Sequence, residues 1–178
     1  MAKILILFSS VDGHTFKIAN KIKNILASND HEIDIISVDD YPMINTDYDF
    51  ILIGASIRYG NYRKSLYRFI NDNISVLKNV KTAFFSVNAT ARKAGKDNPE
   101  TDRYVQKFKT KSGWNPDFVA IFAGVIDYPK YSFFDRMMIR FIMFLTHGPT
   151  DSSSTFEFTD WRKVDSFGIQ LSSNLKHS

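Results

Sequence analysis

The 178-residue chain contains no cysteine. This absence excludes disulfides, zinc sites built on cysteine and thiol chemistry, and it is compatible with the cytosol. Long hydrophobic runs are also missing, since no stretch reaches the roughly 20 apolar residues that a membrane-spanning helix needs. Only five apolar residues follow Lys3, so we expect no secretory signal peptide at the start of this sequence.

The patterns of several other protein classes are absent as well. No two of the four histidines have metal-ligand spacing, so we expect no metal site on His14, His31, His147 or His177. The Gly-x-Ser-x-Gly elbow of a serine hydrolase does not occur. The lysines are scattered rather than interleaved with aromatic residues, so we expect no nucleic-acid partner.

What the chain does contain is 44% hydrophobic and 15% aromatic residues, with a net charge of +4. This composition is typical of a folded protein rather than a disordered one. The length suits a single domain over residues 1–178 with a full core. A mildly basic surface favours anionic lipids or acidic substrates, although an ordinary solvated surface also explains it.

Apolar runs and helical periodicities alternate along the chain. The apolar runs predict strands at residues 3–8, 32–38, 50–54, 81–87 and 118–126. The helical spacings predict helices at residues 15–26, 64–77, 100–110 and 161–175, the last capped by Thr159 or Asp160. This alternation predicts an α/β fold: a doubly wound, five-stranded parallel sheet covered on both faces. Ligands of such sheets bind beyond the carboxyl ends of the strands.

Residues 127–155 form an insert before the last predicted helix. Within it, Phe133–Leu145 is densely apolar and long enough for about three helical turns. Arg136 and Arg140 lie four residues apart and so share one face of this helix. Two interpretations stay open. The helix lies on a membrane with its basic face toward lipid head groups, or it packs in the core or in a dimer interface.

The loop at residues 9–15 follows the first strand and precedes the first helix. The free N–H groups and the dipole of a helix N-terminus favour a phosphate at such a position. Gly13 lets the backbone approach a ligand, and Ser9, Ser10 and Thr15 can donate hydroxyl hydrogen bonds. The loop is neither a Walker A motif nor a dinucleotide fingerprint. A serine-rich turn without a ligand is the alternative.

The loop after the third strand, residues 54–62, can contact a flat ring. Its small residues let a ring approach the backbone, and Tyr59 and Tyr62 can stack on it. Arg58 can offset negative charge that develops on a reduced ring. The alternative is a surface loop with ordinary aromatic residues.

The loop after the fourth strand, residues 86–93, offers donors for the polar edge of a heterocycle. Arg92 and Lys93 can bind carboxylates of a substrate, or they belong to a solvated basic turn. Together the three loops describe a mononucleotide site. In the flavodoxin-like strand order 2-1-3-4-5, flavin mononucleotide (FMN) lies at the switch point between strands one and three.

Over nearly its whole length the sequence resembles the flavodoxin-like, quinone-linked protoporphyrinogen IX dehydrogenases. The resemblance rests on segments at residues 5–9, 12–15, 53–60, 85–88, 91–93, 123–124, 128–131, 135–139 and 159–161. Among them, Gly-Ala-Ser-Ile-Arg-Tyr-Gly at 54–60 and Ala-Arg-Lys at 91–93 are specific to this group within the flavodoxin class.

The resemblance implies FMN as the cofactor. It also implies that six electrons and six protons leave protoporphyrinogen IX and pass to menaquinone or ubiquinone, with flavin N5 as the hydride acceptor and no identified catalytic side chain. The insert is implied to serve activity and membrane attachment. We therefore expect a peripheral protein on the cytoplasmic face of the cell (inner) membrane, with a homo-oligomer left open.

By the same resemblance, the FMN phosphate is expected on Ser9, Ser10, Gly13, His14 and Thr15. The isoalloxazine ring is expected near Ser56, Ile57, Arg58, Tyr59, Ser86, Val87 and Asn88, with Thr150 and Asp151 close by. Asp12 departs from the threonine that is usual in flavodoxins. Because a carboxylate repels phosphate, we expect Asp12 to turn away and brace the Asp-Gly turn.

Two other functions stay in play: a flavodoxin-type electron carrier and an NAD(P)H:quinone reductase. Carriers of this type are usually acidic and lack an apolar, basic insert, whereas this chain is basic and has one. Oxidation of NADPH would distinguish the reductase.

Overall fold

Five parallel strands form the central sheet of the computed structural model, which describes residues 1–28, 31–44 and 48–175. The strands are β1 (Lys3–Ser9), β2 (Glu32–Ser37), β3 (Phe50–Ser56), β4 (Lys81–Asn88) and β5 (Phe118–Ala123). Their order is β2-β1-β3-β4-β5, and each neighbouring pair is parallel. The predicted flavodoxin-like topology is therefore confirmed.

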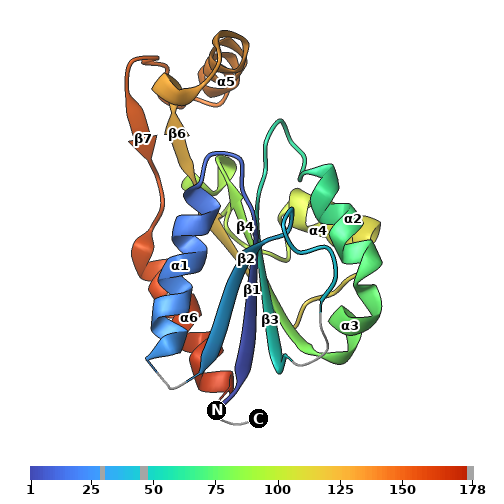
Figure 1. The fold of residues 1–178 in the computed structure, drawn as a ribbon. Helices are drawn as coiled ribbons and strands as arrows, with labels where there is room; N and C mark the ends of the chain where they lie inside the picture. Colours follow the sequence, from blue (N-terminus) through green and yellow to red (C-terminus); the bar gives the residue numbers. More distant parts are fainter. Residues whose placement is uncertain (29–30, 45–47, 176–178) are drawn as a thin grey trace.

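Helices cover both faces of this sheet (Figure 1). One face carries α1 (His14–Ala27) and α6 (Trp161–Leu175), and the other carries α2 (Lys64–Asp72), α3 (Ile74–Asn79) and α4 (Arg103–Ser112). The side chains of β1 alternate between the two cores, with Ile4 and Ile6 in one and Leu5 and Leu7 in the other. A strand buried on both faces reads as a continuous apolar run, which explains why β1 is so plain in the sequence.

The predicted helix at 64–77 is two helices, because the chain turns at Asn73. The Asn73 side chain accepts a hydrogen bond from Ile44 N at 2.7 Å and donates to the carbonyls of Pro42 and Phe69. Its backbone leaves the helical region, with φ −112° and ψ 12°. An asparagine that bonds nearby backbone groups competes with helix continuation.

The predicted strand at 118–126 is also divided, at Gly124. β5 ends at Ala123, and β6 (Val125–Asp127) leaves the sheet to pair with β7 (Thr155–Glu157) in an antiparallel ribbon. A Cβ on Gly124 would lie 3.0 Å from Val87 Cγ1, so the Val87 side chain packs closely against the backbone at Gly124. At the start of α6, the Asp160 carboxylate accepts from Arg162 N, whereas the Thr159 hydroxyl donates to Ala123 O.

The insert stands at the end of this ribbon, above the carboxyl edge of the sheet (Figure 1). It contains a short 3-10 turn, η2 (Tyr128–Lys130), and the predicted helix, α5 (Phe133–Leu145). It has a small core of its own, in which Ile126, Tyr128, Tyr131 and Met143 are buried. The insert is thus a compact addition to the fold rather than a loose loop.

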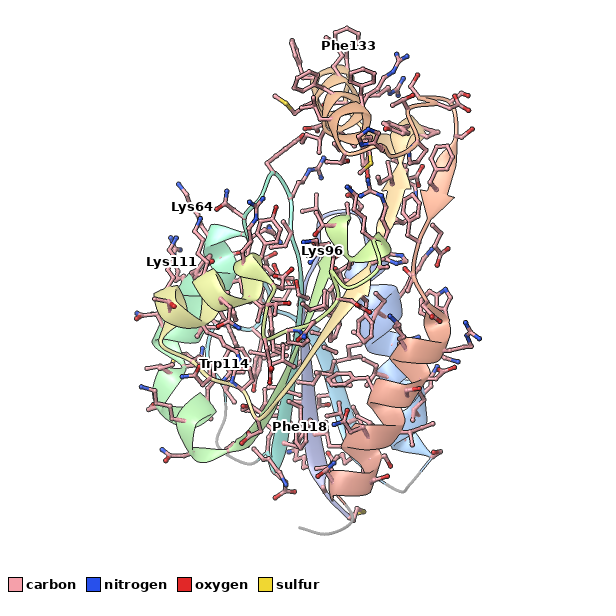
Figure 2. All side chains as sticks on the ribbon, turned by 180° about the vertical axis from the view of Figure 1, so that it is seen from behind. Lys64, Lys96, Lys111, Trp114, Phe118 and Phe133 are labelled. Atoms are coloured by element: carbon pink, nitrogen blue, oxygen red, sulfur yellow. The ribbon has the colours of Figure 1, made fainter. Side chains whose placement is uncertain are left out.

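Helix α5 is not a core helix of this chain. Of its residues only Met143 is buried, and Phe133 points outward at its far end (Figure 2). Most of its large apolar side chains are exposed: Phe133, Phe134, Met137, Met138, Phe141, Ile142, Phe144 and Leu145. Within the described ranges, no helix has both the length and the hydropathy to cross a bilayer.

Glycine at position 54 is explained by packing in the core and not by the contact with a ligand that its loop position suggests. A Cβ at this position would overlap the ring of Phe85 inside the core, so Gly54 makes room for a phenylalanine and not for a ligand. We predict that Gly54→Ala lowers the free energy of unfolding by about 2 kcal/mol, the usual cost of overpacking a core. Urea denaturation measures this change. The double variant Gly54→Ala/Phe85→Leu should recover part of the loss; a single variant as stable as wild type would contradict the prediction.

Candidate functional site

One cavity of about 240 Å³ lies at the carboxyl ends of β1, β3 and β4. It brings together the three loops that the sequence singled out, although they are far apart in the chain. The predicted cofactor residues that line it are Ser10, His14, Thr15, Ser56, Ile57, Arg58, Tyr59, Val87 and Asn88. The insert closes it from above with Tyr131, Ile139, Ile142 and Met143.

The loop between β1 and α1 is preorganised. Ser10 Oγ accepts a hydrogen bond from Gly13 N at 3.0 Å, and Gly13 adopts φ 82° directly before α1. A Cβ on Gly13 would meet nothing within 4 Å, so glycine is required here for the left-handed backbone rather than for space. Thr15 Oγ1 is buried and has no hydrogen-bond partner.

His14 lines the cavity, but its side chain is bonded to Thr159, and Ser9 lies outside the lining. Ser9 is buried at the end of β1 outside the lining, and Gly13 does not line the cavity either. The His14 side chain is 2.7 Å from the Thr159 hydroxyl and packs edge-on against Trp161. Burial lowers the pKa of His14, so the ring is neutral near pH 7.

Asp12 does not brace the Asp-Gly turn, contrary to expectation, because Ser10 takes that role. Its carboxylate instead reaches Arg58 Nη1, at 3.4 Å, across the cavity wall. The far side of the same guanidinium pairs with Asp135 of α5, with 3.2 Å between Nη2 and Oδ2. Burial works to lower the pKa of Arg58, but Asp12, Tyr59 and Asp135 outweigh it and leave that pKa raised.

A tight turn follows β3 and carries Tyr59 to the cavity. Arg58 and Asn61 exchange both backbone hydrogen bonds, at 3.0 and 3.2 Å, around Tyr59 (φ 51°) and Gly60 (φ 74°). Positive φ at both central residues is the geometry of a type I′ turn. Tyr59 is 46% exposed and lines the cavity, so its ring is accessible to a ligand.

Tyr62 cannot stack on a ligand, and this part of the prediction is wrong. Its side chain is only 5% exposed and lies among Phe84 and Phe108 in the core. Its hydroxyl donates to Ser86 Oγ at 2.7 Å, which also turns Ser86 away from the cavity. Burial raises the pKa of Tyr62, so it stays protonated.

Asn88 is the polar group of the third loop. Its Oδ1 accepts from Thr90 Oγ1 and Ala91 N, both at 2.8 Å, at the start of η1 (Thr90–Arg92). Its Nδ2 is buried and has no partner, although two donor hydrogens are available there. The cavity therefore has one unused hydroxyl at its Thr15 end and one unused amide at its Asn88 end.

Four other predicted residues lie outside the lining. Arg92 donates to Ala89 O, Thr146 O and Thr146 Oγ1. Its guanidinium therefore binds the end of α5 and does not face an open surface. Lys93 is exposed beside it. Thr150 lies on the outer side of α5, and Asp151 binds Ser153 and Ser154, which lower its pKa to about 2. Ligand binding by these four residues stays a prediction that their positions do not favour.

The sequence analysis missed the contribution of the insert to the cavity. Ile139, Ile142 and Met143 line it, but the helical spacing of apolar residues in α5 does not tell an inner face from an outer one. Tyr131 belongs to residues 128–131, one of the segments on which the family resemblance rests. This was the signal in the sequence for a role of the insert at the site. In the described part of the chain, no group of three or more histidine or carboxylate side chains is placed to hold a metal ion.

Comparison with known proteins agrees with this geometry. The flavodoxin domain family matches residues 5–153. Protoporphyrinogen IX dehydrogenase [quinone] of Escherichia coli (strain K12) is 39% identical, over 95% of this chain and 94% of that protein. The protein of the same name from Leishmania major is 41% identical, over 93% of this chain and 72% of that protein. The chain belongs to the flavodoxin domain family.

Solved structures of this family show the same fold. Flavodoxin 1 from Bacillus cereus superposes with a TM-score of 0.57 at 18% identity, over 99% of both chains. A flavodoxin from the domain Archaea has a TM-score of 0.55 at 16% identity, over 98% of this chain and 99% of that one. Within the family, the two dehydrogenases are far more similar in sequence than these flavodoxins.

FMN is the cofactor of this flavodoxin-domain protein, and the described residues fit it. The N-terminus of α1 and the unpartnered Thr15 hydroxyl suit a phosphate. The unpartnered Asn88 amide suits a carbonyl or ring nitrogen of the flavin, and the Tyr59 side chain suits its face. A buried donor without a partner costs free energy, so both positions gain from a ligand.

We predict that Thr15→Ala weakens FMN binding roughly 10- to 100-fold, because a hydrogen bond to a charged group contributes about 1.5–3 kcal/mol. Stability without FMN should be nearly unchanged, since the hydroxyl has no partner in the protein. Titration by flavin fluorescence measures the affinity. Thr110→Ala, at an exposed position on α4, is the matched control and should bind FMN as wild type does. Equal affinities in the two variants would contradict the binding of the FMN phosphate to this loop.

Proposed function

We propose that this FMN oxidoreductase oxidises protoporphyrinogen IX to protoporphyrin IX and passes the electrons to a membrane quinone. The relatives at 39–41% identity carry the name of this reaction. The observation that favours it in this chain is the apolar roof that α5 adds to the cavity, with Ile139, Ile142 and Met143. A hydrophobic macrocycle suits such a roof better than a polar substrate does.

When bound, FMN supplies the hydride acceptor, so the protein's own task is to hold and orient. The loop at Ser10 and Thr15 would bind the phosphate, and Asn88 would hold one edge of the ring. Arg58 would supply positive charge beside the cavity to offset negative charge on a reduced flavin. The apolar side chains of α5 exclude water. No described side chain is needed as an acid or base in this account.

The reaction can be followed by fluorescence without oxygen. We expect protoporphyrin fluorescence to appear when the FMN-loaded protein is mixed anaerobically with protoporphyrinogen IX and a menaquinone or ubiquinone analogue. Without quinone, the signal should stop once the bound flavin is reduced. Stopped-flow bleaching of the flavin compares donors directly. Rapid bleaching by NADPH, with none by the porphyrinogen, would favour a quinone reductase; bleaching by neither would favour an electron carrier.

We also propose that the outer face of α5 attaches the protein to the cytoplasmic face of the cell (inner) membrane. The support is a continuous set of exposed apolar side chains, of which Phe134 is 81% exposed. An amphipathic helix of this kind lies in the membrane interface rather than across it. Such a position brings the cavity next to a quinone that is dissolved in lipid.

The charged face of α5 differs from the one expected from the sequence. Arg136 does not face lipid, since its guanidinium donates to the carbonyls of Tyr128 and Tyr131 within the insert. Arg140 is exposed and can meet an anionic head group. The attachment that we propose is therefore mainly apolar, with one cation rather than two.

We predict that Phe134→Ser/Phe141→Ser weakens binding to vesicles of anionic phospholipid roughly tenfold or more. Burial of one phenylalanine side chain contributes about 1.5–3 kcal/mol, and both rings are exposed in the protein. Co-sedimentation with vesicles measures the partition. Ile169→Ser removes an equally exposed apolar side chain from α6 and should have no effect.

Unchanged vesicle binding in the double variant would contradict membrane attachment by α5. If the same variant instead converts a dimer to a monomer in sedimentation velocity, the exposed face is a dimer interface.

A further inference from the structure

One carboxylate joins the insert to the loop after β3. Asp135, in the first turn of α5, pairs with Arg58 Nη2 at 3.2 Å and accepts a hydrogen bond from the Tyr59 hydroxyl. These two residues are consecutive in the type I′ turn, and both line the cavity. Asp135 does not line it, so any effect of this residue on a bound ligand passes through the turn.

The turn is strained and depends on contacts that hold it in place. Tyr59 has a positive φ, which is strained for a residue with a large side chain, and it is 46% exposed. Such a conformation persists only where neighbouring groups over-determine it. Within the turn, Arg58 and Asn61 bond to each other, and Asn61 Nδ2 donates to Tyr59 O at 3.1 Å. The hydroxyl bond to Asp135 adds a contact that ties the Tyr59 side chain to α5.

Helix α5 likewise depends on a small number of anchors. Most of it is exposed, and Arg92 holds its C-terminal end through Thr146. At the N-terminal end, Asp135 is the side chain that reaches the body of the protein. The two ends of α5 are thus tied to two different loops of the cavity, the Arg92 loop after β4 and the Tyr59 turn after β3.

The ion pair between Asp135 and Arg58 belongs to a larger network and is not an isolated surface pair. Arg58 is shared between Asp135 and Asp12, so one cation faces two carboxylates. Asp135 also accepts from Ser132 Oγ at 2.9 Å, which orients it. Single exposed ion pairs contribute little to stability, whereas networks with several defined partners contribute more.

We propose that Asp135 is a positioning residue through which the insert sets the geometry and the charge of the flavin-binding turn. With α5 docked, Asp135 holds Tyr59 in its left-handed conformation and neutralises one side of Arg58. When α5 moves away, the turn relaxes and Arg58 pairs with one carboxylate, that of Asp12. The positive charge of Arg58 then acts more strongly on the cavity. The position of the insert is therefore communicated to the turn through this carboxylate, beside the cation–π contact of Tyr131 with Arg58 at 5.5 Å. The proposal rests on the proposed function only in treating this turn as part of the flavin site.

Hydrogen exchange on the full chain without FMN or substrate tests the first half. The amides of Arg58 and Asn61 are bonded across the turn and report its opening, while Ile57 N, bonded to Val87 O at 2.8 Å, reports the neighbouring strand. In Asp135→Asn we expect exchange at Arg58 and Asn61 to be roughly tenfold faster or more, as for loss of a hydrogen bond to a charged group. Ile57 should exchange as in wild type.

The matched control separates positioning from a general loosening of α5. Arg136 ties the start of α5 to the carbonyls of Tyr128 and Tyr131, so Arg136→Lys loosens this end of the helix while it keeps the charge and leaves Asp135 with its partners. We expect this variant to leave the exchange of Arg58 and Asn61 at the wild-type rate. Equal rates in Asp135→Asn and wild type, or an equal increase in both variants, would overturn the proposal.

The second half is read from the midpoint potential of bound FMN. Asp135→Asn should shift this potential to more positive values, because a less neutralised Arg58 favours added electrons. Arg136→Lys should leave the potential unchanged, and Asp12→Asn should shift it in the same direction as Asp135→Asn. A negative shift, or none, in Asp135→Asn would contradict the electrostatic role. Neither measurement uses a porphyrin or a quinone, so both are independent of the substrate assignment.

Discussion

The parallel pairing of β1 with β3 is the constraint on which the site depends. From β1 the chain passes through α1 to β2 on one side, and from β3 it passes through α2 to β4 on the other. The two connections diverge on opposite faces of the sheet (Figure 1), which leaves space between the loops at the carboxyl edge. The register aligns Ser9 with Ala55 and Ser56 with Val87, so the three strands end at nearly the same level. The hydroxyls, the turn and the amide of the cavity are side by side for this reason.

Much of this arrangement could be predicted from local pattern. Buried strands of a parallel sheet are uninterrupted apolar runs, and a loop with serine and glycine before a helix marks an anion site whatever surrounds it. The sequence could not tell Tyr59 from Tyr62, because both lie in the same loop after β3, which ends at Ser56. The position of Tyr59 depends on its tight turn, and the burial of Tyr62 depends on Phe84 and Phe108, which come from other elements. A core tyrosine and a ligand-facing tyrosine look alike until those partners are known.

The remaining errors concern charged residues, and they share a cause. Asp12 was expected to brace its own turn, Arg92 to bind a substrate or face solvent, and Arg136 to face lipid. Each bonds to other groups of the protein, and the partners of Asp12 and Arg92 are 46 and 54 residues away. Long-range pairing of this kind leaves no periodic signal. The insert supplies such a partner for Arg92, and its role in the cavity was missed although its helix was predicted well.

The contact between His14 and Thr159 has a consequence for charge at the phosphate end of the cavity. The Thr159 hydroxyl donates its only hydrogen to Ala123 O, so its oxygen must accept the hydrogen bond from His14 Nε2. A neutral His14 then carries its proton on Nε2 and leaves Nδ1 bare. The imidazole can therefore contribute no positive charge and no second N–H to an anion in the neighbouring loop. A dianion bound there would be balanced by peptide dipoles and hydroxyls instead, a way of holding phosphate that would be insensitive to the protonation of His14 near neutral pH.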